Sequence, residues 1–471
     1  MQHVAFGGRL VMLGFGSIGQ GVLPLVLRHI DIPRERITIV TAEPRGKEVA
    51  AEYGIRFIQQ AATRENFAEL LSPLLSAGDF LLNLSVDVAS VELMKLCQRL
   101  DVLYLDTVVE PWAGGYTDPA LTPSQRSNYA MREEAIALRD AARGGPTSIT
   151  AHGANPGLVS HFVKQALLDI ARDTGGSVEP PPAADRAAWA AIAERLGVKV
   201  IHIAERDTQV GAHPKRPGEF VNTWSVDGFV GEGCQPAELG WGTHEKAMPA
   251  DGHRHGFGCD AAIYLMRPGA STRVRTWTPL EGPFHGFLIT HNESISLADY
   301  YTARNADGSV RYRPTTHYAY HPCDDAVLSV HELAGKNWEM QPEKRLMTDE
   351  IVSGMDELGV LLMGHAKGAY WYGSRLTIAE ARRVVPHNNA TSLQVTAAVL
   401  AGVIWAIENP RRGVVESDEM DHARILEICA PYLGEVVGVY SDWTPLQGRG
   451  VLFPEAVDTA DPWQFANIRV G

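Results

Sequence analysis

The chain has 471 residues, which at about 150 residues per domain corresponds to two or three domains. Hydrophobic residues make up 45% and charged residues 21%, which excludes a disordered tail, a collagen-like fibre and a coiled-coil rod. Asp and Glu (56) outnumber Lys and Arg (42), and the net charge of −14 argues against a nucleic-acid or anionic-membrane partner, since both need a basic surface.

The cysteines and the apolar stretches are those of a soluble, cytoplasmic protein. The five cysteines are an odd number without a C-x-x-C pair, which is typical of reduced thiols and not of a disulfide framework. The start of the chain lacks the pattern of a signal peptide. The most apolar stretch, 395–407, has 13 residues, fewer than the ~20 that span a bilayer.

Residues 1–152 alternate between β-branched apolar runs and helical segments. The predicted strands are 9–13, 36–40, 55–58, 80–84, 103–109 and 147–150, and the predicted helices between them include 19–29, 46–53, 90–99 and 126–143. Strands that alternate with helices indicate βαβ crossovers. We therefore predict an α/β fold with an N-terminal Rossmann-type, doubly wound parallel sheet.

Residues 153–471 differ in composition and periodicity from residues 1–152. They form a larger predicted α+β domain for substrate binding and dimerisation. Gly, Pro, Trp and His become frequent, and 208–248 shows no clean helical period. The exception is 391–408, a helix that is apolar almost all round and ends at Asn409-Pro410. Such a helix is expected to be buried, packed back on the nucleotide domain or at a dimer interface.

A glycine fingerprint follows the first predicted strand. Gly14, Gly16 and Gly19 form G-x-G-x-x-G, with Ser17 and Ile18 inside it. In this motif the first glycine allows a tight turn, the second allows approach of a pyrophosphate, and the third allows close packing of helix on strand. At the first βα junction of a βαβ series, the motif predicts a dinucleotide site.

The end of the second predicted strand bears on the choice between NAD and NADP. An acid there accepts a hydrogen bond from the adenosine ribose 2′-hydroxyl of NAD. Glu43 lies slightly late for this role, Thr41 stands at the usual position, and Arg45 leaves NADP open. These residues favour NAD as the cofactor.

No metal site is predicted. His253 and His255, and the pair His317 and His321, have spacings that can hold a metal ion. No convincing carboxylate or thiolate set accompanies them, so they are more typical of loop histidines and a half-buried polar pair.

Several acids occur in apolar or aromatic surroundings. Asp87 and Glu110 follow predicted strands of the first domain, where the carboxyl ends of the strands form the ligand crevice. Glu205, Glu232 and Glu293 follow later. Each taken alone is more typical of a loop acid or a helix cap. Together with the indole of Trp224 they predict a cage for an ammonium group, held by ion pairing and cation–π attraction.

Longer strings carry a family resemblance. NLSVD, DTVVEPW, GANPG, HIAERDTQ, FVNTWSVDGF, QPAELGWGT, THNESIS, HYAYHPC, DELGVLL and DWTPL closely resemble bacterial homospermidine synthases, over nearly the whole chain. The wider relatives are the saccharopine-dehydrogenase-like oxidoreductases. The resemblance implies a homodimeric enzyme that makes sym-homospermidine from two putrescines, or from spermidine and putrescine, releasing ammonia or diaminopropane, with NAD regenerated within one turnover.

The resemblance also implies site residues. Matched positions of the pocket are Asp87, Glu110, Asn155, Glu205, Trp224, Glu232 and His291, with Glu293 beside them. Cofactor positions are Gly14, Gly16, Ser17, Ile18, Gly19, Glu43, Ser85, Thr107, Ala154, Asn155 and Pro156. The family pattern has an Asp at the end of the second strand where this chain has Thr41, which affects the expected ribose contact.

Removal of hydride beside an amine requires a neutral amine, so a carboxylate must take its proton. We predict proton transfer or inner ammonium binding for Glu205 and Glu232, and ammonium anchoring for Asp87 and Glu110. Asn155 and His291 are expected to orient the amine and the nicotinamide.

Two other functions stay open at this point. A saccharopine- or carboxynorspermidine-type dehydrogenase would need convergent Arg or Lys for substrate carboxylates, and Arg206, Arg273 and Arg275 are available. A non-catalytic NAD-binding sensor or scaffold would need no acid cage.

Overall fold

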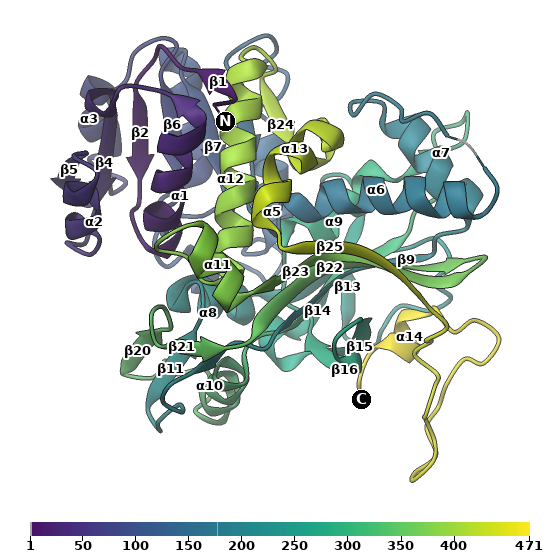
Figure 1. Ribbon diagram of the computed structural model, residues 1–471. Coiled ribbons are helices and arrows are strands. Elements are labelled where there is room, and N and C mark those ends of the chain that lie inside the picture. Colours follow the sequence, from purple (N-terminus) through teal and green to yellow (C-terminus); the bar gives the residue numbers. More distant parts are fainter. Residues whose placement is uncertain (1, 177) are drawn as a thin grey trace.

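The computed structural model describes residues 2–176 and 178–471, which form two sheets with helices packed around them (Figure 1). The first sheet has seven parallel strands in the order β24-β8-β7-β6-β2-β4-β5. They are β2 (Leu10–Leu13), β4 (Ile37–Thr41), β5 (Arg56–Gln59), β6 (Phe80–Asn83), β7 (Leu103–Asp106), β8 (Ser148–Thr150) and β24 (Val414–Glu416).

The topology of this sheet opens a crevice at the carboxyl end of β2. The neighbours of β2 are β4 on one side and β6 on the other, so the strand order reverses direction there, as in dinucleotide-binding folds. The connecting helices are α1 (Ser17–His29), α2 (Lys47–Glu52), α3 (Phe67–Leu71), α4 (Ser90–Leu100) and α5 (Asn128–Ile136). Strands β2, β6 and β7 are buried throughout, as expected for parallel strands covered on both faces. The predicted fold class is confirmed.

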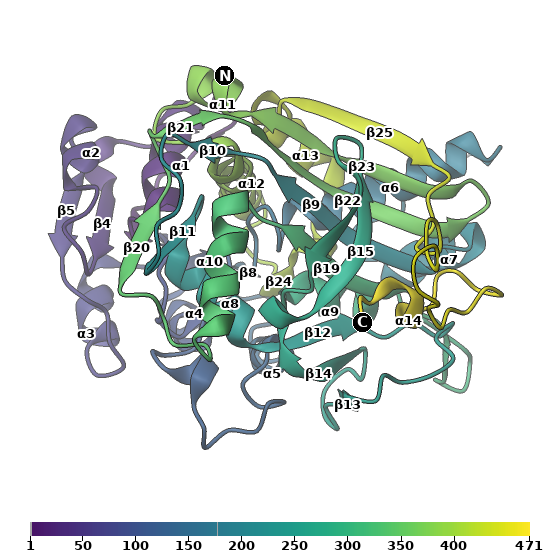
Figure 2. The same cartoon turned by 90° about the horizontal axis from the view of Figure 1, so that it is seen from below.

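The second sheet has ten strands and is mainly antiparallel (Figure 2). Its main path is β13 (Gly252–Arg254), β14 (Ala262–Pro268), β12 (Pro236–Gly240), β19 (Thr315–His321), β9 (Val200–Asp207), β22 (Met355–His365), β23 (Gly368–Thr377) and β25 (Glu435–Ser441). The hairpin β15 (Arg273–Thr278) and β16 (Gly282–Phe287) joins it through β19. Strand β9 is buried at all eight positions and lies in the middle of this sheet.

The remaining elements lie around and between the two sheets. The helices are α6 (Leu158–Asp173), α7 (Arg186–Leu196), α8 (Val226–Cys234), α9 (Asn292–Tyr300), α10 (Asp324–Gly335), α11 (Ile378–Val384), α12 (Ala390–Glu408), α13 (His422–Cys429) and α14 (Phe465–Ile468). Short strand pairs are β1 (Val4–Ala5) with β3 (Ile30–Asp31), β10 (Val210–Gly211) with β21 (Ile351–Ser353), β11 (Glu219–Asn222) with β20 (Glu343–Leu346), and β17 (Ala303–Arg304) with β18 (Val310–Tyr312).

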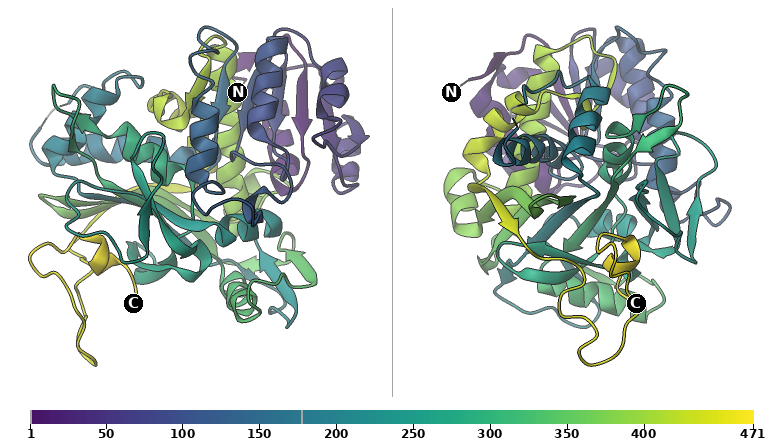
Figure 3. Two further views of the ribbon diagram at one scale, coloured as in Figure 1. Left: turned by 180° about the vertical axis from the view of Figure 1, so that it is seen from behind. Right: turned by 90° about the vertical axis from the view of Figure 1, so that its right-hand side faces the viewer.

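Helix α12 lies between the two sheets (Figure 3). It packs against α1 and β7 on one side and against β22 and β23 on the other. Asn389 and Ser392 form a capping box at its start, and Asn409 ends it. Within the described part of the chain it alone is long and apolar enough to span a membrane, but 89% of the apolar window is buried inside the protein. It therefore has the character of a core helix.

The division into 1–152 and 153–471 stays a prediction. Elements of the second segment pack on the first: β24 extends the parallel sheet beside β8, α12 covers α1, and α9 contacts α5.

Several predicted elements differ from the structure. The predicted helix 126–143 is shorter, since α5 begins after its cap Ser127 and gives way to turns after Ile136. The predicted strand 103–109 ends at Asp106, after which the chain turns toward the crevice. The segment 208–248 contains α8, whose start is capped by the Ser225 side chain. The glycines within this short helix conceal its helical period in the sequence.

Candidate active site

A cavity of about 1150 Å³ runs from the carboxyl ends of the first sheet to β9 and β19 of the second. Every predicted site residue lines it except Glu293. Residues that the sequence did not single out also line it, among them Tyr318, Lys344, Trp112 and Thr391. The volume and the contribution of both sheets are suited to a dinucleotide together with a small substrate.

The glycine loop is shaped for a pyrophosphate. Gly14 has φ +88°, and a Cβ there would lie 2.6 Å from the Leu84 backbone, so no other residue fits. A Cβ on Gly16 would meet nothing within 4 Å, which leaves that side of the loop open. No side chain caps the start of α1, so its first N–H groups are available to an anion.

The adenosine end of the cavity lies beyond β4 and β5. Thr41 ends β4, and its carbonyl accepts a hydrogen bond from the Gln60 N–H. Glu43 and Arg45 follow Thr41, and all three line the cavity. Across from them the Arg64 guanidinium lies 5.9 Å from the centre of the Trp112 ring.

At the other end, the turn Gly153–Gly157 between β8 and α6 presents Asn155. Gly157 has φ +127°, and a Cβ there would lie 2.2 Å from the Gly153 carbonyl oxygen, so the tight turn requires glycine. Ala154, Asn155 and Pro156 line the cavity together with Ser85 and Thr107.

Glu205 projects from β9 into the cavity and is 2% exposed. Its Oε2 accepts hydrogen bonds from Asn155 Nδ2 (2.7 Å) and the Tyr318 hydroxyl (2.5 Å). Burial raises the pKa of Glu205 to about 7, although these two donors oppose the shift. A carboxyl with this pKa can take up and release a proton near neutral pH.

Two further buried acids lie behind Glu205. Asp207 is on the same strand, and Asp356 on β22 hydrogen-bonds Glu205 and accepts a bond from the Thr391 hydroxyl (2.6 Å). Burial, followed by the charges of Glu205 and Asp207, raises the pKa of Asp356 well above its usual range. Neutral Asp356 therefore donates to Glu205 without adding a second charge.

Glu110 and Asp87 follow β7 and β6. Glu110 is 4% exposed, and burial, with the charges of Glu232 and Asp87 adding to it, raises its pKa to about 8. Asp87 is more exposed and has φ +64°, an uncommon conformation for a non-glycine residue. Burial and the charge of Asp227 raise its pKa.

His291 lies between two carboxylates. Its Nε2 is 2.9 Å from Glu232 Oε2 and its Nδ1 is 3.2 Å from Glu293 Oε1. Burial disfavours the charged ring, but Glu232 and Glu293 outweigh it and raise the pKa of His291 to about 10. The ring is therefore an imidazolium at neutral pH, and Glu293 supports it from outside the cavity.

Trp224 is held from three directions. Its Nε1 donates to the Tyr320 hydroxyl (3.3 Å), and its carbonyl accepts a hydrogen bond from the Ser17 hydroxyl of the glycine loop (2.6 Å). A Cβ on Gly228 would lie 3.0 Å from the indole Cζ3, so the ring packs on the first turn of α8. The indole is half-buried and lines the cavity.

Tyr318 and Tyr320 were missed by the sequence reasoning. Their rings stack at 5.0 Å and 11°, and they link Trp224 to Glu205. Their spacing of two residues on one strand places them on the same face, a signal present in the string HYAYH. Within residues 2–176 and 178–471, no group of three or more His, Cys, Asp or Glu has the arrangement of a metal site.

The chain matches two domain families, one after the other along the sequence. It matches the saccharopine dehydrogenase NADP binding domain over residues 10–149 and the saccharopine dehydrogenase C-terminal domain over residues 153–441. Homospermidine synthase of Blastochloris viridis is 57% identical over 98% of this chain and 97% of its own length, and that of Mesorhizobium japonicum 54% identical over 98% and 96%. The crystal structure of the Legionella pneumophila homospermidine synthase in complex with NAD superposes with a TM-score of 0.92 at 50% identity, covering 99% of this chain and 98% of that one. With these relatives and this site, the chain belongs to the homospermidine synthase family of saccharopine-dehydrogenase-like proteins.

Proposed function

We propose that the chain catalyses NAD-dependent synthesis of sym-homospermidine, joining two putrescines with release of ammonia, or spermidine and putrescine with release of diaminopropane. One observation carries the proposal beyond family membership. Glu110 and Glu205 are buried in the cavity that contains the glycine loop, and in the described residues neither forms an ion pair with Lys or Arg. Such carboxyls are suited to a cationic ligand.

The nucleotide half of the cavity fits NAD. The α1 N-terminus and the open side of Gly16 suit the pyrophosphate, Glu43 the adenosine ribose, and Ser85, Thr107 and the Ala154–Pro156 turn the nicotinamide. When bound, NAD accepts a hydride from the carbon beside the amine and returns it to the new carbon–nitrogen double bond later in the turnover.

Glu205 takes the proton of the reacting ammonium. Its pKa of about 7 makes it a base at neutral pH, and Asn155 and Tyr318 fix its orientation. Because a neutral amine is required before hydride can leave, this step prepares the carbon for oxidation.

Asp87 and Glu110 hold the distal ammonium. They lie in the loops that follow the neighbouring strands β6 and β7, and both side chains have raised pKa values, so a bound ammonium would stabilise their charged forms. Fixing that end positions the reacting carbon beside the nicotinamide.

Trp224 and His291 act on the charge that develops. The π face of the indole attracts an iminium ion, and the restraints on the ring hold it in place. The His291 imidazolium, paired with Glu232, holds a proton for the amine that departs.

The dehydrogenase alternative requires basic side chains for a substrate carboxylate. Arg206, Arg273 and Arg275 do not line the cavity. Its basic lining residues are Arg45 and Arg64 at the adenosine end and Lys344, which forms an ion pair with Asp227. Among the described residues, the cation beside Glu205 is the His291 imidazolium, which Glu232 and Glu293 already neutralise, and no Lys or Arg converges there.

The decisive experiment incubates the purified protein with carbon-13-labelled putrescine and NAD and analyses the amines by mass spectrometry. We expect doubly labelled homospermidine and ammonia in equal amounts, without accumulation of NADH. A rise in NADH absorbance equal to the putrescine consumed would indicate an amine dehydrogenase, and no consumption of putrescine would favour a sensor or scaffold.

We further propose that the protein is a homodimer in the cytoplasm. A loop near the C-terminus, closed by the Arg449–Glu455 ion pair (2.6 Å), presents Val451, Leu452 and Phe453 with exposures of 78%, 86% and 77%. Figure 1 shows this loop projecting from the body of the molecule. Three adjacent exposed apolar side chains mark an association surface. The five free cysteines suit a reducing compartment.

Light scattering tests the dimer. The wild-type protein should have twice the mass of one chain, and Leu452→Asp with Phe453→Asp should raise the dissociation constant of the dimer at least tenfold. A dimer that tolerates both changes would place the association surface elsewhere.

A further inference from the structure

A second hollow lies on the reverse side of the sheet that carries Glu205. It has a volume of about 370 Å³ and lies between the β15–β16 hairpin, the end of β19 and α10. Figure 2 shows α10 and β15 on the same side of the molecule. Its lining residues are Arg273, Glu281, Phe284, His285, Gly286, Phe287, His321, Val327 and His331.

Strand alternation explains why this hollow is basic while the active-site cavity is acidic. Along β9 Glu205 enters the cavity, and the next residue, Arg206, points to the other face. On β19 the same holds for Tyr318 and His321, which lie three residues apart. Arg206 ion-pairs with Glu281 in the wall of the hollow (3.1 Å), so that acid is already engaged.

Arg273 is an exposed cation at the edge of the hollow, and among the described residues it has no acidic partner. Its guanidinium lies 5.6 Å from the centre of the Phe287 ring, and its Nη2 donates to His331 Nε2 at 2.5 Å. Within the described ranges, no carboxylate forms an ion pair with it at 4.0 Å or less. A guanidinium that is oriented by stacking and by one hydrogen bond keeps further N–H donors for an oxyanion.

Three imidazoles line the hollow with Arg273, and His331 contacts it directly. Burial, and after it the positive charge of nearby arginines, lowers the pKa of each: Arg275 and Arg273 act on His285, Arg206 on His321 and Arg273 on His331. Arginine charges therefore act on all three histidines, although Glu281 and Asp324 oppose them at His321. A neutral imidazole has one N–H donor: that of His321 is used by the Pro322 carbonyl, whereas His285 and the Nδ1 of His331 can donate to an anion.

From this arrangement we propose that the hollow binds a phosphate group, in a site separate from the catalytic cavity. Donors on β15 (Arg273), β16 (His285) and α10 (His331) approach from different directions, which suits a tetrahedral oxyanion better than a planar carboxylate. The phosphate can be inorganic, or part of a phosphate ester whose organic portion contacts Phe284.

The test is calorimetric titration of the full-length protein saturated with NAD, so that the pyrophosphate site is occupied. The probes are sodium phosphate, glycerol 2-phosphate and malonate, at constant ionic strength set with chloride. Arg273→Gln should weaken phosphate binding at least tenfold. Arg254→Gln is the matched control, because Arg254 lies outside the hollow on β13 and carries the same charge. It should leave the phosphate dissociation constant within twofold.

Each outcome bears on the proposal. Tighter binding of glycerol 2-phosphate than of phosphate identifies an ester as the ligand, and the reverse identifies inorganic phosphate. Malonate binding as tightly as phosphate, unchanged phosphate binding by Arg273→Gln, or an absence of phosphate binding by the wild type would overturn the site. His285→Gln gives a second variant, expected to weaken binding severalfold, should Arg273→Gln fail to fold.

Discussion

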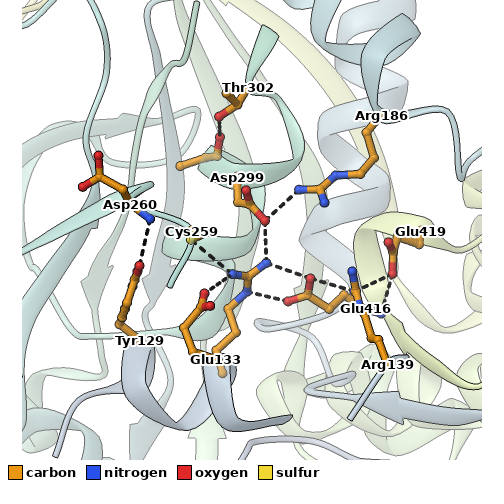
Figure 4. A network of polar contacts seen from close by, with 12 residues as sticks. Tyr129, Glu133, Arg139, Arg186, Cys259, Asp260, Asp299, Thr302, Glu416 and Glu419 are labelled. Carbon is orange, nitrogen blue, oxygen red and sulfur yellow. Dashed lines mark hydrogen bonds and ion pairs between the residues drawn. The ribbon is translucent and has the colours of Figure 1, made fainter. Parts of the chain in front are cut away.

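Helix α9 carries an acid at each end, and the two acids belong to different kinds of buried cluster. At its start Glu293 belongs to the catalytic cluster with His291 and Glu232. At its end Asp299 belongs to a network around Arg132, which bonds Asp299 (2.9 Å) and Glu416 (2.6 Å) (Figure 4). Both acids have a built-in cation, His291 or Arg132, whereas Glu205 and Glu110 of the adjoining cavity face no Lys or Arg among the described residues.

In the Arg132 network every acid has a fixed cation. Burial opposes the charge of Asp299, but Arg132 and Arg186 outweigh it and hold its pKa at about 2. Arg132 and Arg139 likewise lower the pKa of Glu416 against the effect of its burial. These carboxylates are charged throughout the physiological range and tie α5 to α9 and β24.

In the catalytic cavity the balance is reversed. Burial raises the pKa of Glu205 to about 7 and that of Glu110 to about 8, and in the described structure no Lys or Arg compensates either carboxylate. An ammonium substrate would supply the missing charge. The cation is therefore delivered by the ligand for Glu110 and Glu205, whereas it is built into the Arg132 network and, through His291, beside Glu232 and Glu293.

The largest expected effect is on the structural side. Arg132→Met removes the more deeply buried of the two cations that face each of Asp299 and Glu416, leaving only Arg186 and Arg139, which should lower the free energy of unfolding by about 3–5 kcal/mol. Urea unfolding followed by circular dichroism measures the loss. Arg132→Lys, which keeps the charge but not the bidentate geometry, should lose less. A loss below about 1 kcal/mol for Arg132→Met would make the network a minor contributor.

On the catalytic side, Glu205→Gln removes the buried carboxylate proposed as the general base. It should lower kcat about 10²–10⁴-fold, since a general base is removed, while the unfolding temperature stays the same or rises. In the wild type, kcat/KM should increase with pH up to about 7, where Glu205 loses its proton, and the variant should lack this limb. Stopped assays of homospermidine across pH 5.5–9 measure both, and a variant that keeps the limb would assign it to another group.

The pH dependence of stability should distinguish Glu110 from the acids of the Arg132 network. Its folded pKa of about 8 lies above its ordinary value of 4.5, so its stabilising contribution is complete below 4.5 and is lost as pH rises through 8. The loss is at most about 1.4 kcal/mol per pH unit within this window. Thermal unfolding at pH 5–9 should show it in the wild type and less in Glu110→Gln. Putrescine should offset it, because the bound ammonium favours the charged carboxylate.

Asp299 serves as the internal reference for that measurement. Its pKa is depressed, so its contribution is present above 3.8 and is lost only as pH falls toward 2. Asp299→Asn should therefore lower stability by the same amount at pH 6 and at pH 9. A pH-dependent difference would mean that the Arg132 network is not permanently charged.

The nucleotide half of the molecule could be predicted from local signals. The glycine motif, the β-branched runs and their order determine the parallel sheet and the turn at Gly14. Two acids of the cage could be named for the same reason, because Asp87 and Glu110 lie in the loops that follow β6 and β7.

The partners of those acids could not be predicted in the same way, because they come from distant segments. Asp356 reaches Glu205 only through the pairing of β22 with β9, a long-range register that no local pattern specifies. The same holds for Tyr318, for the bond between Ser17 and Trp224, and for the position of Arg273 behind the sheet.

The smallest expected effect concerns the contact that joins the two halves of the cavity. Ser17 donates its hydroxyl proton to the Trp224 carbonyl, while the N–H groups at the start of α1 stay available to a pyrophosphate. Ser17→Ala should therefore change the NAD dissociation constant less than threefold. It should lower kcat at saturating NAD and putrescine about 2–10-fold, the equivalent of one hydrogen bond of about 0.5–1.5 kcal/mol.

Ser17→Thr retains a hydroxyl and should keep most of the activity, which separates the bond from a general loss of packing. Fluorine NMR of protein labelled with 5-fluorotryptophan gives a readout that does not depend on turnover. The Trp224 signal, assigned by its absence from Trp224→Phe, should shift in Ser17→Ala and not in Ser17→Thr. If saturating NAD restored kcat in Ser17→Ala with the Trp224 signal unmoved, the hydroxyl would serve the cofactor alone, and the indole would be positioned by Tyr320 and Gly228.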